Sequence, residues 1–115
     1  MITVGVGAST GVTSAEVLAA VDAVLPSDAL HVRLATLAAR ADEPGIAGAA
    51  AERGWPLTGY SAAELAAVTV PSPSDRVAAH VGTGSVAEAA ALVGGGTLVV
   101  GKTVHGPVTL AVARD

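Results

Sequence analysis

The sequence predicts an α/β fold with three layers, α/β/α, built on a mainly parallel sheet of about five strands that ends in an antiparallel hairpin. Short apolar segments rich in β-branched residues alternate along the chain with segments that begin at capping residues and carry an apolar helical stripe. Strands that alternate with helices form parallel sheets covered on both faces. The 115 residues, 1–115, are expected to form a single domain.

The predicted strands differ in how clearly the sequence marks them. The first, at residues 2–6, is apolar almost throughout, as in a strand that is covered on both faces. The last two, at residues 97–101 and 107–113, are separated by five residues that could turn one back on the other as a hairpin. The two remaining strands are expected at residues 31–37 and 57–60.

Several predicted helices begin with a serine or threonine placed three residues before a glutamate. In such a capping box, each of the two side chains satisfies a backbone N–H of the first turn. The boxes are Thr13 with Glu16, Ser61 with Glu64, and Ser85 with Glu88. A further helix is expected to have Asp42 as its N-cap and Pro44 in its first turn and to reach about Arg53, and a short one is expected around residues 75–80.

Composition excludes several classes of function. The formal net charge is −4 and the six basic residues are scattered, so nucleic acid is not an expected partner, because that affinity depends on clustered Lys and Arg. Cysteine is absent, which excludes disulfides and thiolate metal sites. No apolar run reaches the length of about 20 residues that spans a bilayer, and no secretion signal is visible. A cytoplasmic location without a membrane partner is therefore expected.

Gly5, Gly7 and Gly11 follow the first strand and precede a helix, where a glycine-rich loop can hold a phosphate. Arg40, after the second strand, could meet the 2′-phosphate of NADP. The dinucleotide fold, however, needs two mononucleotide halves, and this chain is too short for both. A tight strand-to-helix turn explains the glycines equally well.

A second candidate for anion binding lies before the helix expected at Ser85. The glycines on either side of Thr83 leave its N–H groups open to a ligand, and the free N–H groups of a helix start attract anions. Lys102, the only lysine in the sequence, follows the strand predicted at residues 97–101. It is either a ligand contact or a solvated lysine of the hairpin turn.

Candidates for catalysis have simpler explanations. Asp42 and Glu43 are neighbouring carboxylates, but their expected place at a helix start explains them first as capping groups. The sequence also contains His31, His80 and His105. Their spacing matches no pair of metal ligands, so no metal site is predicted, and no cofactor is predicted either.

Ordered segments over nearly the whole chain carry a family resemblance. They are Gly5-Val-Gly7 with Thr13-Ser14, Arg40-Ala-Asp42-Glu43-Pro44-Gly45, Tyr60-Ser-Ala-Ala-Glu64-Leu65, Val70-Pro-Ser-Pro-Ser74, Val81-Gly-Thr83, Ser85-Val-Ala-Glu88-Ala-Ala-Ala91, Leu98-Val-Val-Gly-Lys102 and Thr109-Leu-Ala-Val-Ala-Arg114. As a set they resemble the CobE/CbiG carboxyl-terminal domain of cobalamin biosynthesis. The first loop departs from the family pattern G-x-G-C-R-x-G, because Ala8, Ser9 and Thr10 stand in it.

The resemblance implies a three-layer α/β/α domain that works on corrin-ring precursors. Longer relatives of this family hydrolyse the lactone of cobalt-precorrin-5A and release acetaldehyde, whereas shorter, stand-alone relatives belong to the aerobic pathway. The present chain has the stand-alone length. Arg40 replaces a lysine that is frequent in the family before the Asp-Glu pair and keeps its charge.

We therefore expect a precorrin or cobalt-precorrin, a polyanion with an apolar macrocycle, as the ligand of an accessory or carrier module. A hydrolase and a small nucleotide-binding module are the alternatives, and whether the chain is an enzyme is left open. Hydrolysis would need a general base, for which His105, Asp42 and Glu43 are candidates. Other corrin-pathway enzymes are candidate partners. The expected ligand-binding residues are Gly5, Gly7, Ser9, Gly11, Arg40, Asp42, Glu43, Gly82, Thr83, Ser85 and Lys102.

Overall fold

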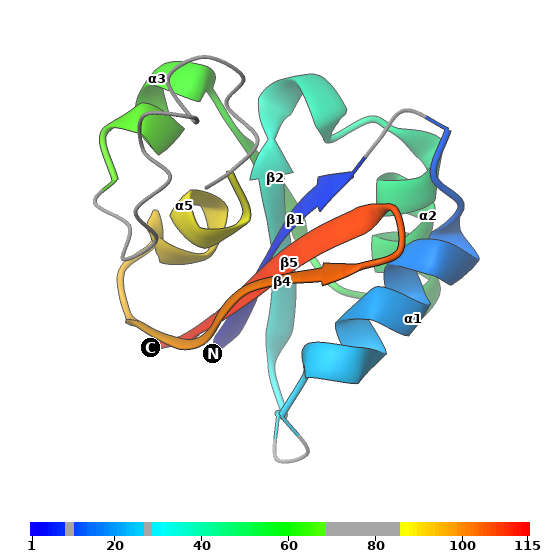
Figure 1. Cartoon of the computed structure of the whole chain (residues 1–115), viewed down its shortest axis with the longest axis horizontal. Coiled ribbons are helices and arrows are strands. Elements are labelled where there is room, and N and C mark those ends of the chain that lie inside the picture. Colours follow the sequence, from blue (N-terminus) through cyan, green and yellow to red (C-terminus); the bar gives the residue numbers. More distant parts are fainter. Residues whose placement is uncertain (9–10, 27–28, 69–85) are drawn as a thin grey trace.

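The structure is a computed structural model that describes residues 1–8, 11–26, 29–68 and 86–115 (Figure 1). These residues form a five-stranded sheet in the order β3-β2-β1-β5-β4. The strands are β1 (Ile2–Ala8), β2 (Val32–Leu37), β3 (Leu57–Tyr60), β4 (Thr97–His105) and β5 (Val108–Arg114). The helices are α1 (Ser14–Val24), α2 (Pro44–Arg53), α3 (Ala62–Ala66) and α5 (Val86–Leu92), with a 3₁₀ turn η1 (Ala38–Arg40).

The sheet is parallel in its amino-terminal part and antiparallel at its carboxyl-terminal end. β1, β2 and β3 pair in parallel, whereas β5 runs antiparallel to both of its neighbours, β1 and β4. The predicted α/β class and the carboxyl-terminal hairpin are thus confirmed. β4 runs in the same direction as β1, so β1, β2, β3 and β4 all end at one edge of the sheet, here called the carboxyl edge.

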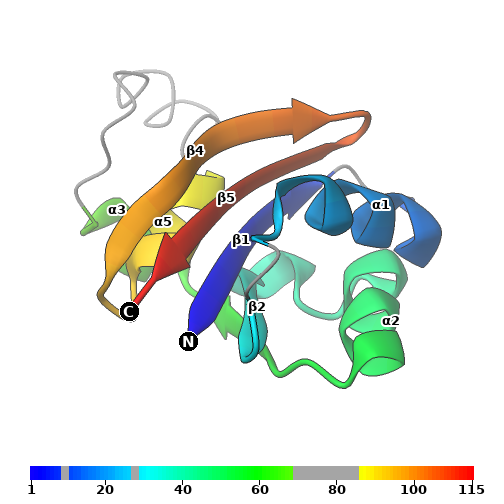
Figure 2. The ribbon, with the colours of Figure 1, turned by 90° about the horizontal axis from the view of Figure 1, so that it is seen from below.

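Helices cover both faces of the sheet, and the two faces differ in side-chain size. Figure 2 shows α1 and α2 on one face and α3 and α5 on the other. The α1 and α2 face holds the large core residues, including Val4, Leu34 and Leu110, all fully buried. Facing α5, the sheet carries small residues such as Ala111, so this helix can approach the strands closely.

Gly5 marks the closest approach between α5 and the sheet. A Cβ atom added at Gly5 would lie 1.9 Å from the carbonyl oxygen of Ala87 and 2.8 Å from the backbone nitrogen of Ala91. The backbone of α5 therefore rests directly on β1, and only a residue without a side chain fits beneath it.

Two of the predicted capping boxes are present. At the start of α1, Glu16 N–H donates to Thr13 Oγ1 at 3.1 Å, and Thr13 N–H donates to Glu16 Oε1 at 2.9 Å. Ser61 and Glu64 make the same reciprocal pair at the start of α3. In the third box, Ser85 lies outside the described residues.

The start of α2 differs from the prediction by one residue. Glu43 is the N-cap, and not Asp42, because the helix begins at Pro44. The residue before a proline is driven to extended backbone, and Glu43 has φ −60° and ψ 123°. Its side chain makes no capping hydrogen bond, which leaves the carboxylate available for another partner.

The hairpin turn also lies later than predicted. β4 continues to His105, so the turn is at Gly106 and Pro107, and Lys102 stands inside a strand. The β-branched residues Thr103 and Val104 favour this extension, and both pair with β5. The predicted turn over residues 102–106 is therefore wrong.

An ion pair joins α1 to α2. Both terminal guanidinium nitrogens of Arg53 donate to the carboxylate of Asp22, at 3.0 and 2.8 Å, and the guanidinium carbon lies 5.4 Å from the centre of the Trp55 ring. The hydrogen bonds from Arg53 hold the pKa of Asp22 below its ordinary value of 3.8, although burial acts in the opposite direction. This pair makes the stability of the helix layer depend on pH.

We expect Asp22→Asn to lower the free energy of unfolding near neutral pH, with the difference from wild type vanishing in acid. Because the pKa of Asp22 is lower in the folded chain, the pair stabilises the fold above the unfolded pKa and loses its effect as the pH falls through the folded value. Urea titrations at about pH 7 and about pH 2 measure both differences. Asp42→Asn, at an exposed carboxylate, is the control, and an equal loss in both variants would contradict the assignment.

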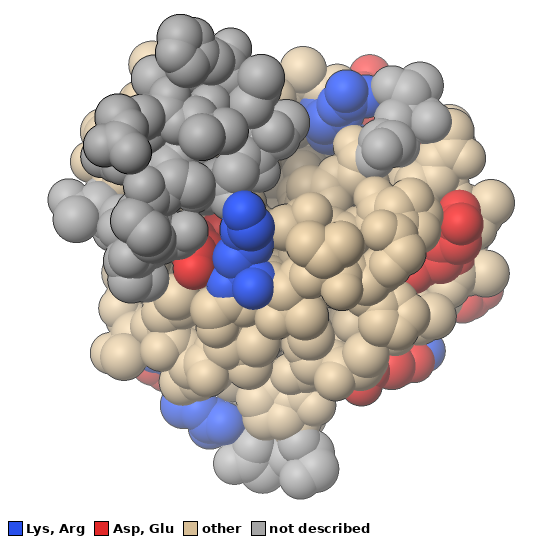
Figure 3. All heavy atoms as spheres, in the orientation of Figure 1, with Lys and Arg blue, Asp and Glu red and all other residues tan. Residues whose placement is uncertain are grey.

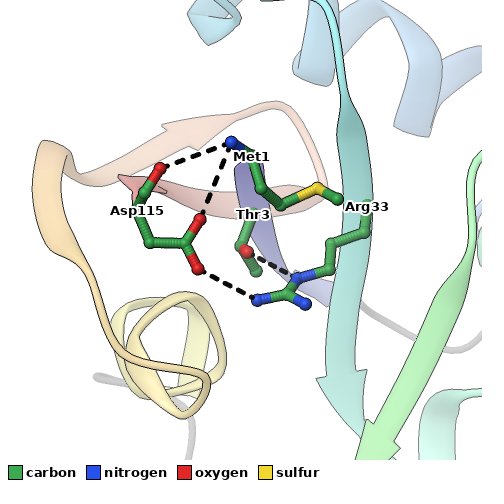
Figure 4. A network of polar contacts seen from close by, with 4 residues as sticks. All are labelled: Met1, Thr3, Arg33 and Asp115. Carbon is green, nitrogen blue, oxygen red and sulfur yellow. Dashed lines mark hydrogen bonds and ion pairs between the residues drawn. The ribbon is translucent and has the colours of Figure 1, made fainter.

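The first and last residues are held together at the edge opposite the carboxyl edge (Figure 4). The amino group of Met1 lies 3.7 Å from a carboxylate oxygen of Asp115, and Arg33 lies 3.7 Å from the other. Arg33 Nε also donates to Thr3 Oγ1 at 2.8 Å. These contacts join β1, β2 and the end of β5.

Among the described residues, no helix has the length and apolar character needed to cross a bilayer.

Candidate functional site

The loop after β1 is joined to the start of α2 at the carboxyl edge. Gly11 has φ +90°, a conformation that favours glycine, and its N–H donates to Glu43 Oε1 at 3.1 Å. The carboxylate that does not cap α2 thus binds the first loop. Since this amide already holds an anionic group of the protein, the bond argues against a phosphate at Gly11, which the nucleotide hypothesis requires.

Close packing fixes the same connection. A Cβ atom at Gly45, in the first turn of α2, would lie 2.1 Å from the carbonyl oxygen of Val12. One strand over, the buried hydroxyl of Thr36 donates to the carbonyl oxygen of Val6 at 2.7 Å, just beyond the last paired residues of β1 and β2. The start of α2 is thus packed directly on the backbone at Val12, and the hydroxyl of Thr36 ties the end of β2 to β1.

The glycines of the first strand have different surroundings. Gly5 is buried beneath α5, and close packing accounts for it. Gly7 is half-buried, and a Cβ atom there would meet its nearest neighbours, on Thr109 and Val86, only at 4.0 Å. Of the two, only Gly7 has room for a side chain beside its backbone as far as the described residues are concerned.

Two cations predicted for the site lie on different parts of the sheet. Arg40 ends η1 directly after β2, whereas Lys102 is exposed in β4. Three strand spacings separate β2 from β4, which corresponds to about 14 Å across the sheet. Figure 3 shows basic side chains at separate places on this face with uncharged surface between them. Only a large ligand with several charged arms could contact both.

Glu88, predicted from the sequence only as a capping partner of Ser85, makes a contact with β4. It is 3% exposed on α5, and its Oε2 accepts a hydrogen bond from the backbone N–H of Lys102 at 3.0 Å. Oε1 is also buried and has no hydrogen-bond partner among the residues that the structure describes. The contact brings a carboxylate next to the lysine of β4.

An irregularity in β4 makes this contact available. The register of β4 against β5 shifts between Leu98 and Val100 and again between Val100 and Thr103. The second shift leaves Gly101 and Lys102 opposite the single residue Ala111 of β5, as in a β-bulge. The N–H of Lys102 can therefore turn towards Glu88 rather than towards β5.

The other predicted residues are placed as follows. Asp42 is exposed between η1 and α2, and His105 is exposed at the end of β4. The remaining predicted residues lie outside the described residues: Ser9, Gly82, Thr83 and Ser85. The structure thus brings Gly11 and Glu43 into direct contact, and it places Lys102 beside Glu88.

The fold defines the chain as a small three-layer α/β domain, a class that binds ligands at the carboxyl edge of the parallel strands. Residues 2–113 match the family described as Cobalamin synthesis G C-terminus, and the chain belongs to this family. The resemblance found in the sequence is thereby confirmed, and the chain is a cobalamin biosynthesis protein.

Relatives and solved structures agree with this assignment. The chain is 30% identical to a cobalt-precorrin-5A hydrolase of Priestia megaterium, with 98% of the chain and 32% of the relative covered. It is 43% identical to the CobE protein of a Sinorhizobium species, over 78% of the chain and 60% of that protein. It thus spans less than two thirds of either relative.

Two crystal structures resemble the chain over nearly its full length. The cobalamin biosynthesis protein chiG of Agrobacterium tumefaciens has a TM-score of 0.75 and 35% identity, covering 99% of this chain and 98% of that one. A structure of CobE, from the cobalamin biosynthetic pathway, has a TM-score of 0.75 and 27% identity, and the match covers 100% of this chain and 93% of the CobE chain.

Proposed function

We propose that the chain binds a precorrin or cobalt-precorrin intermediate at its carboxyl edge and acts as an accessory or carrier module of corrin-ring biosynthesis. The observation that carries this proposal is the family match over residues 2–113. The name of one relative, a cobalt-precorrin-5A hydrolase, supplies the class of ligand, a tetrapyrrole with carboxylate arms.

The charges of the described residues support such a ligand. Lys102 is exposed in β4 and Arg40 follows β2, two strands that lie three strand spacings, or about 14 Å, apart in the sheet. Between these strands lies β1, where the surface at Gly7 carries no side chain and an added Cβ atom would meet its nearest described neighbours at 4.0 Å. A macrocycle with acidic arms could rest on that surface, with its arms reaching the cations.

The proposal is tested by mixing the purified chain with cobalt-precorrin-5A and following both absorbance and acetaldehyde. A carrier is expected to co-elute with the unchanged pigment during size-exclusion chromatography. Release of acetaldehyde would instead establish the hydrolase, which is the second candidate because a hydrolase is 30% identical over 98% of the chain. Absence of both co-elution and product would overturn the proposed function.

For Lys102→Ala we expect affinity for a carboxylated tetrapyrrole to fall by about 1–3 kcal/mol, because a charge-assisted hydrogen bond to a carboxylate arm is lost. Fluorescence titration with uroporphyrin, a stable tetrapyrrole with the same kind of arms, measures the change.

Arg53→Ala is the matched control for Lys102→Ala, since it removes one positive charge from α2, on the other face of the sheet from α5. Equal affinity of wild type and Lys102→Ala would remove Lys102 from the site. An equal loss in both variants would show that only net charge matters.

A further inference from the structure

The bulge in β4 determines which face of the sheet Lys102 occupies. Before the bulge, Val100 lies opposite Val112 and packs against the core beneath α1 and α2. After the bulge, Thr103 lies opposite Leu110 of the same core, and residues directly opposite each other in a ladder share a face. Because neighbours along a strand alternate between the faces, Lys102 lies on the face covered by α5, here called the α5 face.

A regular ladder would place the lysine on the other face. Continued without the second register shift, the pairing would put Lys102 opposite Leu110, on the face covered by α1 and α2. Gly7, where the ligand surface is proposed, follows Gly5 by two residues in β1 and therefore lies on the α5 face. The bulge thus turns the ammonium to the face on which the ligand is proposed to bind.

Glu88 is the side chain that holds this bulge. It is buried, its Oε2 accepts the backbone N–H of Lys102 at 3.0 Å, and a Cβ atom at Gly101 would lie 3.6 Å from the same oxygen. α5 is a fixed support for this side chain, because the backbone of the helix rests on β1 at Gly5. None of the ion pairs found among the described residues includes the Lys102 ammonium, so the contact with Glu88 is one to the backbone.

We propose that Glu88 is a positioning residue of the ligand site: by holding the N–H of Lys102, it maintains the bulge that presents the lysine on the α5 face. This inference rests on the proposed function and assigns Glu88 no contact with the ligand. Without an acceptor at residue 88, the N–H of Lys102 loses its partner, and the regular register with the lysine on the other face becomes competitive. The site then loses its cation although the lysine is still in the chain.

The experiment is a double-mutant cycle measured by uroporphyrin affinity. Glu88→Met removes the acceptor at similar side-chain length and is expected to weaken binding about fivefold or more, as Lys102→Ala does. Glu88→Gln keeps an oxygen that accepts the bond, so its affinity is expected to stay within about twofold of wild type. In the Lys102→Ala background, Glu88→Met is expected to have no further effect, because Glu88 acts only through the lysine. Glu52→Met, at an exposed residue of α2, is the control and is expected to bind as wild type does.

A readout without ligand is available because Lys102 is the only lysine in the sequence. A chain labelled with ¹⁵N-lysine therefore gives a single backbone amide signal, whose hydrogen exchange reports the bond to Glu88. Exchange is expected to be about tenfold faster or more in Glu88→Met and nearly unchanged in Glu88→Gln.

Two exchanges of neighbouring residues test the face directly and leave Glu88 in place. Lys102→Thr combined with Thr103→Lys moves the ammonium to the face of α1 and α2, and it is expected to weaken uroporphyrin binding as much as Lys102→Ala does. Lys102→Gly combined with Gly101→Lys keeps the ammonium on the α5 face, because both bulge residues lie opposite Ala111. Its affinity is expected to persist.

Each outcome decides the inference. A loss in Glu88→Met that disappears in the Lys102→Ala background, with rescue by Glu88→Gln, supports it. A loss of the same size in both backgrounds, an equal loss in Glu88→Gln, or wild-type affinity of Glu88→Met overturns it. If Glu88→Met does not fold, the residue exchanges decide: loss only in the exchange with Thr103 supports the inference, and wild-type affinity of that variant overturns it.

A failure of the proposed function is distinguishable from a failure of this inference. If wild type binds no uroporphyrin, the proposed function fails, and the amide exchange of Lys102 decides the role of Glu88. Faster exchange in Glu88→Met with slow exchange in Glu88→Gln supports Glu88 as the residue that holds the bulge, and unchanged exchange in Glu88→Met overturns it.

Discussion

Replacing Gly5 with alanine is expected to destabilise the chain by about 1–3 kcal/mol, which is the usual cost of adding a methyl group to a filled core. The added Cβ would lie 1.9 Å from the carbonyl oxygen of Ala87, so the backbone of α5 must move away from β1. Backbone cannot swing aside as a flexible side chain can, and the small residues around Gly5 would lose their contacts. The midpoint of urea unfolding measures the loss.

Gly7→Ala provides the matched control, because Gly7 belongs to the same strand and points to the same face. An added Cβ there would find its nearest neighbours at 4.0 Å, and neither glycine has a positive φ. Gly7→Ala is therefore expected to be neutral or to stabilise the fold by up to about 1 kcal/mol, because alanine lowers the conformational entropy of the unfolded chain. Equal unfolding midpoints for the two variants would contradict the close packing of α5 on β1.

A second large effect is expected at Gly45, where alanine should cost about 1–3 kcal/mol and disturb the first loop. The new Cβ would lie 2.1 Å from the carbonyl oxygen of Val12 and would push the start of α2 away from that segment. Glu43, which directly precedes α2, would then lose its hydrogen bond from the N–H of Gly11. Urea unfolding measures the stability, and the NMR shift of the Gly11 amide reports the bond.

The control for Gly45→Ala lies one turn later in α2. A Cβ at Gly48 would stand 3.5 Å from the Cβ of Ser14, which is an ordinary contact, and alanine favours a helix interior by about 1 kcal/mol over glycine. Gly48→Ala should therefore raise the unfolding midpoint. The predicted backbone contact is refuted if Gly45→Ala is as stable as Gly48→Ala or leaves the Gly11 amide unmoved.

Features that depend on neighbouring residues alone could be predicted from the sequence. The capping boxes of Thr13 and Ser61 involve residues three apart, so their geometry follows from local backbone. The antiparallel pairing of the carboxyl-terminal hairpin could also be predicted, because its two apolar segments are close together in the chain. The length of β4 could not be predicted in this way, because the continuation of the strand past Lys102 depends on pairing with β5.

The candidate site was less predictable because one sequence pattern has several structural uses. For the glycines at residues 5–11, a phosphate-binding turn and a closely packed helix both require glycine, and the position of α5 above Gly5 shows that packing explains this one. Likewise, a glutamate three residues after a serine suggests a cap. Glu88 is instead buried and accepts a hydrogen bond from a bulge in β4, a contact that no local pattern reveals.

The irregular pairing of β4 also bears on how copies of this chain behave at high concentration. β4 is an edge strand with two exposed apolar side chains, Val99 (46% exposed) and Val104 (65% exposed). Such an edge could pair with a strand of another chain. Two register shifts in β4, and the charged side chain of Lys102 between the two valines, disturb the regular hydrogen-bonding edge that pairing with another strand requires. The same distortion that presents an amide to a buried carboxylate is thus expected to disfavour fibrillar self-assembly.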